Sequence, residues 1–166
     1  MNKEKLIKFC KSILPYILIV LAVVLVRTFL FTPIRVVGPS MEPTLKSGDV
    51  MILNKVAKIN RFDIVVISSK KSPEILIKRV IGLPGETLEI KDGNIYINGK
   101  VLKENFGKGI TSNYNYVEIH KDEYFVLGDN RSISADSRLF GTFNIKDIKG
   151  TTKLVIFPFK RIGIKK

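Results

Sequence analysis

The sequence of 166 residues is poor in the side chains that build disulfides, metal clusters and histidine-based active sites. It has one cysteine, Cys10, and one histidine, His120. A single cysteine excludes an internal disulfide and any cysteine-based metal cluster. A histidine-based triad has only His120 to use. The sequence also lacks an internal repeat and a glycine-rich phosphate loop of the Walker type. We therefore expect no metal, nucleotide or organic cofactor.

The chain is strongly basic, with 28 Lys and Arg against 15 Asp and Glu, a formal net charge of +13 and a pI near 9.9. Such a charge indicates an anionic partner, either nucleic acid or a lipid surface. Nucleic acid is disfavoured because 45% of the residues are hydrophobic and no known binding motif focuses the lysines. We expect anionic membrane lipid, and no nucleic acid, among the partners.

A long apolar run follows a basic segment at the start of the sequence. Residues 1–12 carry four lysines against one glutamate, and residues 13–31 are apolar apart from Tyr16, Arg27 and Thr28. A helix of this length spans about 28 Å, close to the hydrocarbon thickness of a bilayer. A cleavable signal peptide is the alternative, but the apolar core is too long and no small-x-small site follows it. The pattern predicts a cytoplasmic tail over 1–12, a transmembrane anchor over 13–31 with Pro15 in its first turn, and an extracytoplasmic catalytic domain over 32–166.

Short strands punctuated by glycine follow the anchor, with no periodic helical segment of useful length. The candidates are rich in Val, Ile and Phe and bounded by turn signals. They cover residues 35–37, 50–54, 64–67, 75–81, 87–90, 94–97, 124–127 and 153–157. Residues 100–120 show little pattern and are expected to form a surface loop or flap. Roughly 135 residues suffice for one modest core. The prediction is a mostly β domain behind a single N-terminal transmembrane helix.

A candidate nucleophile lies just past the apolar run. Ser40 stands between Pro39 and Pro43, which fix the backbone and remove two donors, so a rigid, non-helical turn is predicted. Gly38 allows another chain to approach the backbone closely. A hydroxyl on a stiff loop at a membrane surface suits a nucleophile, but many ordinary loops also contain one. The stretch by itself leaves the role open.

A candidate base lies in the strand predicted over residues 75–81. Alternation along this strand places Lys78 and Arg79 on opposite faces. Either both cations snorkel from a surface strand, or Lys78 is buried. Burial would lower the pKa of Lys78 and let it accept a proton near neutral pH. A neutral lysine beside a serine hydroxyl activates a nucleophile without histidine.

A third stretch, residues 128–141, holds two acids, two arginines and three serines between glycines. It forms either a surface turn with solvated charges or a hydrogen-bonded platform. The platform would pair Asp136 with Arg138 and present a serine to the active site.

These stretches, in this order behind an N-terminal anchor, resemble the motifs of bacterial type I signal peptidases. The matching runs are SMxPTL at 40–45, GD at 48–49, KRVxGxPG at 78–85 and GDNRxxSxDSRxxG at 128–141. The short segment between the lysine motif and residue 128 resembles the compact enzymes of Gram-positive bacteria. The resemblance implies a mostly β protease domain and a membrane-bound serine endopeptidase that cleaves signal peptides from exported preproteins. Substrates would lie extended along a strand edge, with small residues at the first and third positions before the cut.

By that resemblance Ser40 is the nucleophile and Lys78 the general base. Ser134 matches the serine that hydrogen-bonds and orients the lysine. Five further residues match those that hold the site together: Asp129, Asn130, Arg131, Asp136 and Arg138. Gly38 is a departure, because some family members have a serine or threonine there whose hydroxyl helps form the oxyanion hole. The donor here must be backbone or water, beside the N–H of Ser40. Ile133 is a second departure, since an asparagine often stands at its position.

Two other functions stay open. A self-cleaving or regulatory Ser–Lys protease is disfavoured by the anchor. A non-catalytic basic membrane-surface domain would bind anionic lipid by charge alone. The C-terminal segment suits such an interface, because Phe157 and Phe159 lie near Lys160, Arg161, Lys165 and Lys166. The alternative is that both phenylalanines belong to the core. The sequence is compatible with a monomer.

Overall fold

A computed structural model describes residues 3–165, including the side chains of Phe9 and of residues 11–165. The chain divides into two compact units between Thr32 and Pro33. The predicted cytoplasmic tail, residues 1–12, lies partly outside the described residues.

The first unit is the helix α1 (Lys3–Phe29). Its segment Lys11–Phe29 is long and apolar enough to cross a membrane, and none of it is buried. Because the helix begins at Lys3, Pro15 lies inside it and not in its first turn as predicted, so one intrahelical hydrogen bond is missing there. The helix also ends before the predicted limit of residue 31. Pro33 disfavours helical backbone at the residue before it, and a strand has already begun at Phe31.

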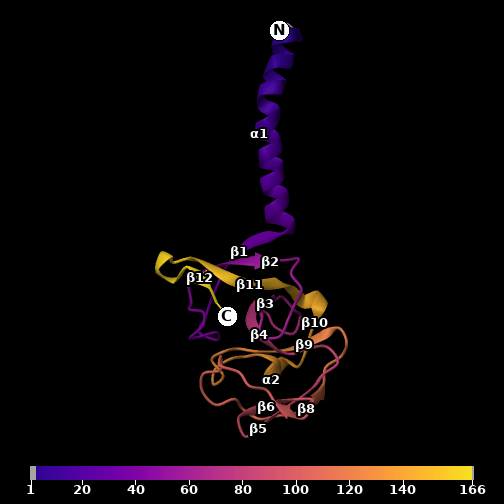
Figure 1. Ribbon diagram of the computed structural model, residues 1–166, viewed down its shortest axis with the longest axis vertical. Coiled ribbons are helices and arrows are strands. Elements are labelled where there is room, and N and C mark those ends of the chain that lie inside the picture. Colours follow the sequence, from indigo (N-terminus) through magenta and orange to yellow (C-terminus); the bar gives the residue numbers. More distant parts are fainter. Residues whose placement is uncertain (1–2, 166) are drawn as a thin grey trace. The chain divides into compact units, whose positions relative to one another are not determined.

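The rest of the chain is mostly β, as predicted (Figure 1). Its strands are β1 (Phe31–Arg35), β2 (Val50–Asn54), β3 (Ile64–Ile67), β4 (Leu76–Gly82), β5 (Thr87–Lys91), β6 (Asn94–Ile97), β7 (Lys100–Val101), β8 (Tyr114–Glu118), β9 (Glu123–Leu127), β10 (Phe143–Asn144), β11 (Ile148–Phe157) and β12 (Gly163–Ile164). Three short helical turns accompany them: α2 (Ser137–Phe140), η1 (Ile145–Asp147) and η2 (Phe159–Arg161).

The strands form two sheets. The larger has the order β1-β2-β11-β3-β4-β9-β10, with β12 beside β11, and the smaller has the order β7-β6-β5-β8. Figure 1 shows β5, β6 and β8 of the smaller sheet well away from β2 and β11 of the larger one. The strand β4 is buried almost throughout because side chains pack on both of its faces. Leu76 and Val80 join one group of buried side chains and Ile81 joins another.

Predicted and observed strands agree best where apolar runs are bounded by clear turns. The strands over 50–54, 64–67 and 94–97 are confirmed to the residue. β5 and β9 differ by one residue at one end, and β4 is shifted by one residue at both ends. The strand predicted at 35–37 is wrong, because the ladder runs from Phe31 to Arg35 instead. β11 begins five residues earlier than the predicted 153, since register shifts carry the ladder past Gly150.

Residues 100–120 are not the pure surface loop that was predicted. They contain β7 and also β8, which pairs with β5. The side chains of β8 are mostly exposed and do not alternate regularly, so the segment carried no recognisable strand pattern.

Candidate active site

The candidate nucleophile lies on a loop that is closed at its base and fastened to the core. The Val36 amide donates to the Asp49 carbonyl at 2.8 Å, and the Gly48 amide donates to the Val36 carbonyl at 2.9 Å. Met41 and Leu45 point into the core, where they are 1% and 0% exposed. We call residues 36–49 the nucleophile loop. Because its ends and two of its side chains are fixed, the half-buried Ser40 has little freedom to move.

Lys78 reaches Ser40 from β4. Its Nζ donates a hydrogen bond of 2.7 Å to Ser40 Oγ, and the lysine is only 3% exposed. Burial, the largest influence, lowers the pKa of Lys78 from 10.5 to about 8. Of the nearby charges, the Asp136 carboxylate raises this pKa and the Arg138 guanidinium lowers it. Lys78 is therefore buried and does not snorkel, and it can release its proton near neutral pH.

Arg79 points to the opposite face of β4, as strand alternation predicts, and is fully buried there. Its Nε and Nη2 donate to the two carboxylate oxygens of Asp129 at 2.8 and 2.6 Å. Its Nη1 donates to the Phe62 carbonyl at 2.9 Å. Asp129 is equally buried, so this ion pair is dry and fixed in two-point geometry. Arg79 therefore braces the loop that follows β9.

Asn130 connects that loop to the nucleophile. Its amide donates to the Ser40 carbonyl at 3.0 Å, and its Nδ2 donates to the Pro39 carbonyl at 3.4 Å. Asp129 precedes it in the sequence, so the buried ion pair with Arg79 fixes the backbone from which Asn130 holds Ser40.

The predicted pair of Asp136 and Arg138 is present, with Arg138 Nη2 and Asp136 Oδ2 2.8 Å apart. Asp136 is fully buried, and its Oδ2 also accepts a hydrogen bond of 3.0 Å from the Gly128 amide. Arg131 is 2% exposed, and its Nε donates to the Gly128 carbonyl at 3.0 Å. The stretch is therefore the hydrogen-bonded platform, and the alternative of a solvated surface turn is wrong.

Ser134 lies at the site, but its hydroxyl does not bond to Lys78 in this structure. Its Oγ is buried and has no hydrogen-bond partner among residues 3–165. A Cβ added to Gly128 would lie 2.1 Å from that Oγ and 2.6 Å from the Ser40 carbonyl oxygen. The hydroxyl thus packs against Gly128 and near the nucleophile, while the lysine donates to Ser40. The expected hydrogen bond from Ser134 to Lys78 is not formed.

Ser40 and Lys78 open onto a groove of about 750 Å³. Its walls are largely apolar and come from residues 34–38, from residues 74–78, and from Ile133 and Ala135. In the described chain, β9 pairs with β4 only from Arg79 onward, although β3 pairs with it from Leu76. The edge of β4 before Arg79 is therefore open beside the groove. An extended peptide can add to such an edge through its backbone.

Gly38 lies on the groove wall with a φ of +83°, in the left-handed region that favours glycine. No atom lies within 4 Å of the Cβ that a side chain would add there. The position has space for a hydroxyl, but its backbone favours glycine.

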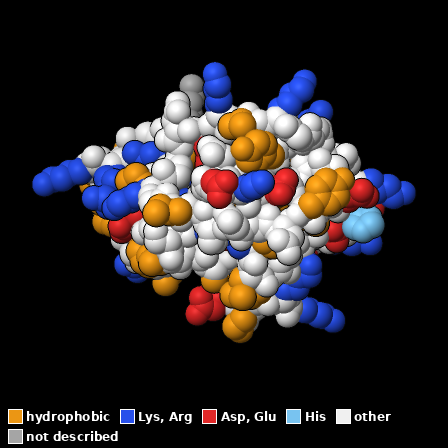
Figure 2. Space-filling view, turned by 90° about the horizontal axis from the view of Figure 1, so that it is seen from below, with side chains coloured by type: hydrophobic (Ala, Val, Ile, Leu, Met, Phe, Trp, Pro, Cys, Tyr) orange, Lys and Arg blue, Asp and Glu red, His pale blue; other side chains and the backbone are white. Residues whose placement is uncertain are grey.

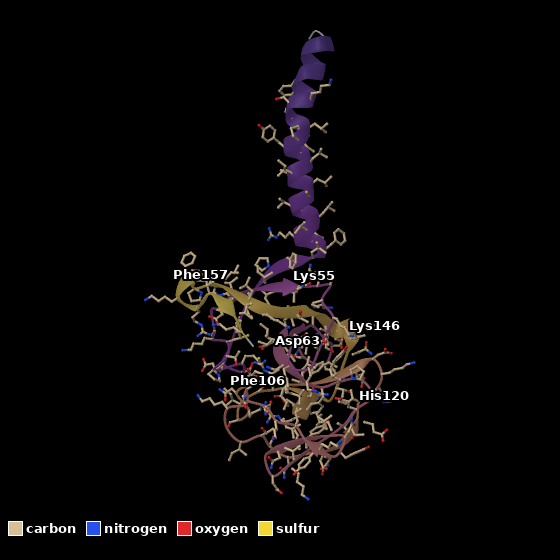
Figure 3. The ribbon with its side chains drawn as sticks, in the orientation of Figure 1. Lys55, Asp63, Phe106, His120, Lys146 and Phe157 are labelled. Carbon is tan, nitrogen blue, oxygen red and sulfur yellow. The ribbon has the colours of Figure 1, made fainter. Side chains whose placement is uncertain are left out.

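His120 does not line the groove. It lies in the exposed turn between β8 and β9, and Figure 3 shows it on the opposite side of the domain from Phe106 in that view. Within residues 3–165, no three His, Cys, Asp or Glu side chains gather in a metal-binding cluster.

Arg161 supports the site in a way that the sequence did not reveal. Its Nε and Nη2 each donate to Asp49 at 2.9 Å, and Nη2 also donates to the Thr44 carbonyl at 3.2 Å. Burial raises the pKa of Asp49, but the hydrogen bonds from Arg161 and from the Lys46 amide outweigh it and hold this pKa below its usual 3.8. Arg161 therefore holds the nucleophile loop, and its predicted contact with the lipid surface stays a prediction. The signal was Asp49 itself, because a buried carboxylate needs a cation.

A buried lysine of lowered pKa, bonded to a serine hydroxyl at the edge of a peptide-sized groove, is typical of serine peptidases that use lysine in place of histidine. The mostly β fold and this site define that class. A family model described as "Signal peptidase, peptidase S26" matches residues 6–157. The chain belongs to this family, and it is a serine endopeptidase of the signal peptidase I type.

Individual relatives agree with the family match. The chain is 41% identical to a "Signal peptidase I P" of Bacillus subtilis subsp. natto, over 97% of this chain and 94% of that protein. It is 33% identical to a "Signal peptidase I" of Streptococcus pneumoniae, over 89% of this chain and 93% of that protein. Among solved structures, a signal peptidase I from Enterococcus faecalis is similar with a TM-score of 0.52 and 34% identity. That match covers 58% of this chain and 97% of the other.

Proposed function

We propose that this peptidase is membrane-bound and removes N-terminal signal peptides from exported preproteins, with Ser40 as nucleophile and Lys78 as general base. The observation that carries the proposal is the 2.7 Å hydrogen bond between Lys78 Nζ and Ser40 Oγ at a lysine that is only 3% exposed. A fully hydrated lysine would hold its proton at neutral pH and could not serve as a base. Burial removes that obstacle.

The chemistry proceeds in two steps. Ser40 Oγ attacks the scissile carbonyl carbon as neutral Lys78 takes the hydroxyl proton. The tetrahedral intermediate collapses when the peptide C–N bond breaks, and the Lys78 ammonium gives its proton to the leaving amine. A water then attacks the resulting ester as Lys78 accepts its proton, and the proton returns to Ser40 Oγ as the ester bond breaks. Lys78 accepts and releases one proton in each step, so it is neutral again when the next step begins.

The oxyanion that forms in both steps needs hydrogen-bond donors. The backbone N–H of Ser40 is the first donor in this proposal, and backbone or water supplies the second, because Gly38 has no hydroxyl. The hydrogen bonds of Asn130 to the carbonyls of Ser40 and Pro39 hold that peptide backbone in place.

The substrate occupies the groove as an extended strand. The open edge of β4 next to Lys78 supplies backbone hydrogen bonds, and alternate substrate side chains point into the apolar wall. By its resemblance to the family, we propose small residues at the first and third positions before the cut, whose side chains point to the same side of an extended strand.

The anchor places the enzyme where its substrates emerge. The apolar segment Lys11–Phe29 spans the bilayer in this proposal. The lysines before it stay in the cytoplasm by the positive-inside rule, so residues 32–166 lie outside. We propose the cell membrane as the location and a monomer as the working form.

The C-terminal segment is proposed to contact an anionic bilayer. Phe157 and Phe159 are 50% and 80% exposed, so the alternative that they belong to the core is wrong. Their rings contact each other at 5.8 Å, and the exposed side chains of Ile162 and Ile164 lie in the segment that follows. Lys160 adds positive charge between them, and apolar and basic side chains together match an anionic interface.

Binding of the domain 33–166 to vesicles tests this contact. We expect binding to vesicles that contain anionic lipid, weaker binding at high salt, and a loss when Phe157 and Phe159 are both changed to Ser. The matched control is Tyr116→Ser, an exposed aromatic on β8. Binding that ignores salt, or that survives the double change, would contradict the proposed contact.

Nucleic acid remains outside the expected partners. Figure 2 shows lysine and arginine side chains spread around the rim of one face, with acidic side chains near its middle. This one face of the described residues therefore shows no continuous basic stripe of the kind that marks a nucleic-acid interface.

A cleavage assay on one preprotein tests the enzymatic proposal. We expect wild-type protein to release the signal peptide, and Ser40→Ala and Lys78→Ala to lose cleavage while still binding the membrane. Lys100→Ala, at an exposed lysine of β7, is the matched control and should cleave normally. Self-cleavage without preprotein cleavage would favour a regulatory Ser–Lys protease. Lipid binding with no cleavage at all would favour a non-catalytic surface domain.

A further inference from the structure

Part of the segment between β7 and β8 is fastened across the loop that carries Asp129 to Arg131. We call residues 104–111 the strap. The Lys108 amide donates to the Asp129 carbonyl at 2.7 Å, and the Arg131 amide donates to the Lys108 carbonyl at 2.9 Å. The two hydrogen bonds form a parallel β-bridge between Lys108 and Asn130. The strap therefore holds the backbone on both sides of Asn130.

Side chains reinforce this bridge. The Glu104 carboxylate accepts from Arg131 Nη2 at 2.6 Å and lies 2.5 Å from Arg131 Nη1. Thr111 Oγ1 accepts from the same Nη1 at 3.0 Å. A Cβ added at Gly107 would lie 2.8 Å from Arg131 Cζ, so the strap backbone presses directly on the guanidinium. Residues at both ends of the strap, Glu104 and Thr111, thus bind the Arg131 guanidinium.

Phe106 makes the strap's contact with the buried ion pair. Its ring centroid lies 3.7 Å from Arg79 Cζ, and its ring packs against Phe62 at 5.2 Å. Figure 3 shows Phe106 at the side of the domain, in the loop that the strap forms. An aromatic face over a desolvated guanidinium is attractive. The half-buried ring also keeps water from the pair of Arg79 with Asp129, and water would weaken that pair.

We propose that Phe106 is a positioning residue for the nucleophile. It holds Arg79 against Asp129, Asp129 fixes the backbone of Asn130, and Asn130 holds the carbonyls of Pro39 and Ser40. Phe106 does not touch the substrate groove, so it acts only through this chain of contacts. The proposal rests on the proposed role of Ser40. It assigns a catalytic purpose to a segment whose sequence has no distinctive motif.

The test compares three variants of the full chain in detergent micelles: Phe106→Ala, Phe106→Leu and Phe106→Tyr. Leu nearly fills the same space but cannot stack on Arg79, so it separates positioning from loss of folding. We expect kcat to fall by about 10-fold to 100-fold in the Ala and Leu variants. KM should stay within about twofold, because the groove walls are unchanged. Phe106→Tyr should keep the wild-type kcat, because its ring can still stack on Arg79. The control Tyr116→Leu should also have the wild-type kcat.

Two results would overturn the proposal. One is a wild-type kcat in both Phe106→Ala and Phe106→Leu, with or without a lower melting temperature. The other is a loss confined to KM. Failure of the proposed function is distinguishable, because Ser40→Ala is assayed on the same preprotein. If Ser40→Ala still cleaves, Ser40 is not the nucleophile. If Ser40→Ala is inactive while Phe106→Ala and Phe106→Leu are both fully active, only the role of the strap is wrong.

Discussion

The burial of Lys78 carries a cost in stability. The same burial that prepares it to accept a proton also disfavours its charged form in the folded state. Its pKa is lowered from 10.5 to about 8, and such a shift corresponds to about 3 kcal/mol. The sign follows from proton binding. Below pH 8 the lysine is charged in both states and the folded chain bears the full cost. Between pH 8 and 10.5 the cost falls as the pH rises, and above that range it is gone.

Lys78→Met should therefore stabilise the domain while abolishing cleavage. We expect the free energy of unfolding at pH 7 to rise by about 1–3 kcal/mol, because Met fills the same space without a charge. The gain should shrink as the pH is raised toward 11. Urea unfolding at both pH values measures this. Lys100→Met, at an exposed lysine, is the control and should change little. A destabilised Lys78→Met variant at pH 7 would contradict the burial argument.

At the residue scale, the sequence predicted that Ser40 and Lys78 lie together, as their hydrogen bond shows, but it did not predict the contacts that brace them. Ser40 and Lys78 lie in short motifs, and strand alternation alone placed Arg79 on the other face of β4. The burial of Lys78 could be seen only in the structure, because the sequence pattern also allowed a lysine that snorkels from a surface strand. Phe106 and Arg161 were missed as supports, since each acts on a residue far away in the sequence. The positive charge that helps to lower the pKa of Lys78 is that of Arg138, and Arg138 comes near Lys78 only when residues 128–141 are folded.

At the scale of elements, the short turn η2 is a further support of the nucleophile loop. Through Arg161 it ties the C-terminal segment to Asp49 and to the Thr44 carbonyl. The adjacent phenylalanines are exposed and are proposed to contact lipid. One segment thus joins the proposed membrane contact to the loop that carries Ser40.

Arg161→Ala should loosen that loop. We expect a loss of about 1–3 kcal/mol at pH 7, because a buried carboxylate loses its charged partner. The pKa of Asp49 is held below 3.8, so its contribution is present above that value and is lost as the pH falls through the lower, folded value. The difference between wild type and variant should therefore shrink in acid. Chemical unfolding at pH 7 and below pH 3 checks this. Lys160→Ala, in the same turn, should show no such difference.

At the element scale, strands with bounded apolar runs were predictable and edge strands were not. β2, β3 and β6 followed from their side-chain pattern. β8 was missed because its exposed side chains give no regular alternation. The strap and β8 lie in the same segment without motifs, where backbone hydrogen bonds and a few side-chain contacts determine the structure.

At the scale of the whole molecule, the basic charge and the apolar helix fit one arrangement in the membrane. In the proposed topology, the lysines before the apolar segment remain inside and residues 32–166 lie outside. The mostly β fold followed from the sequence because strand and turn signals repeat along it. The helix α1 runs from Lys3 to Phe29 and so extends further toward the N-terminus than the predicted anchor over 13–31, whose membrane span stays a prediction.

Protease added to intact cells should digest the domain 33–166 and leave a tag at the N-terminus protected. The expectation follows from the excess of lysine before the apolar segment. Immunoblotting for a tag at each end of the chain shows which end is digested and which is protected. Permeabilised cells are the control, because both tags should then be lost. Protection of the C-terminal tag with loss of the N-terminal one would reverse the proposed topology.

Activation of Ser40 by neutral Lys78 is tested most directly by the pH dependence of kcat/KM for preprotein cleavage. Burial lowers the pKa of Lys78 to about 8, and the neutral form is the proposed base. We expect kcat/KM to rise with pH through a single ionisation near that value and then level off. His120→Ala should give the same profile, and Lys78→Arg should be inactive because a guanidinium keeps its proton. A midpoint near the histidine value of about 6.5 that disappears in His120→Ala, or near-normal cleavage by Lys78→Arg, would contradict the mechanism.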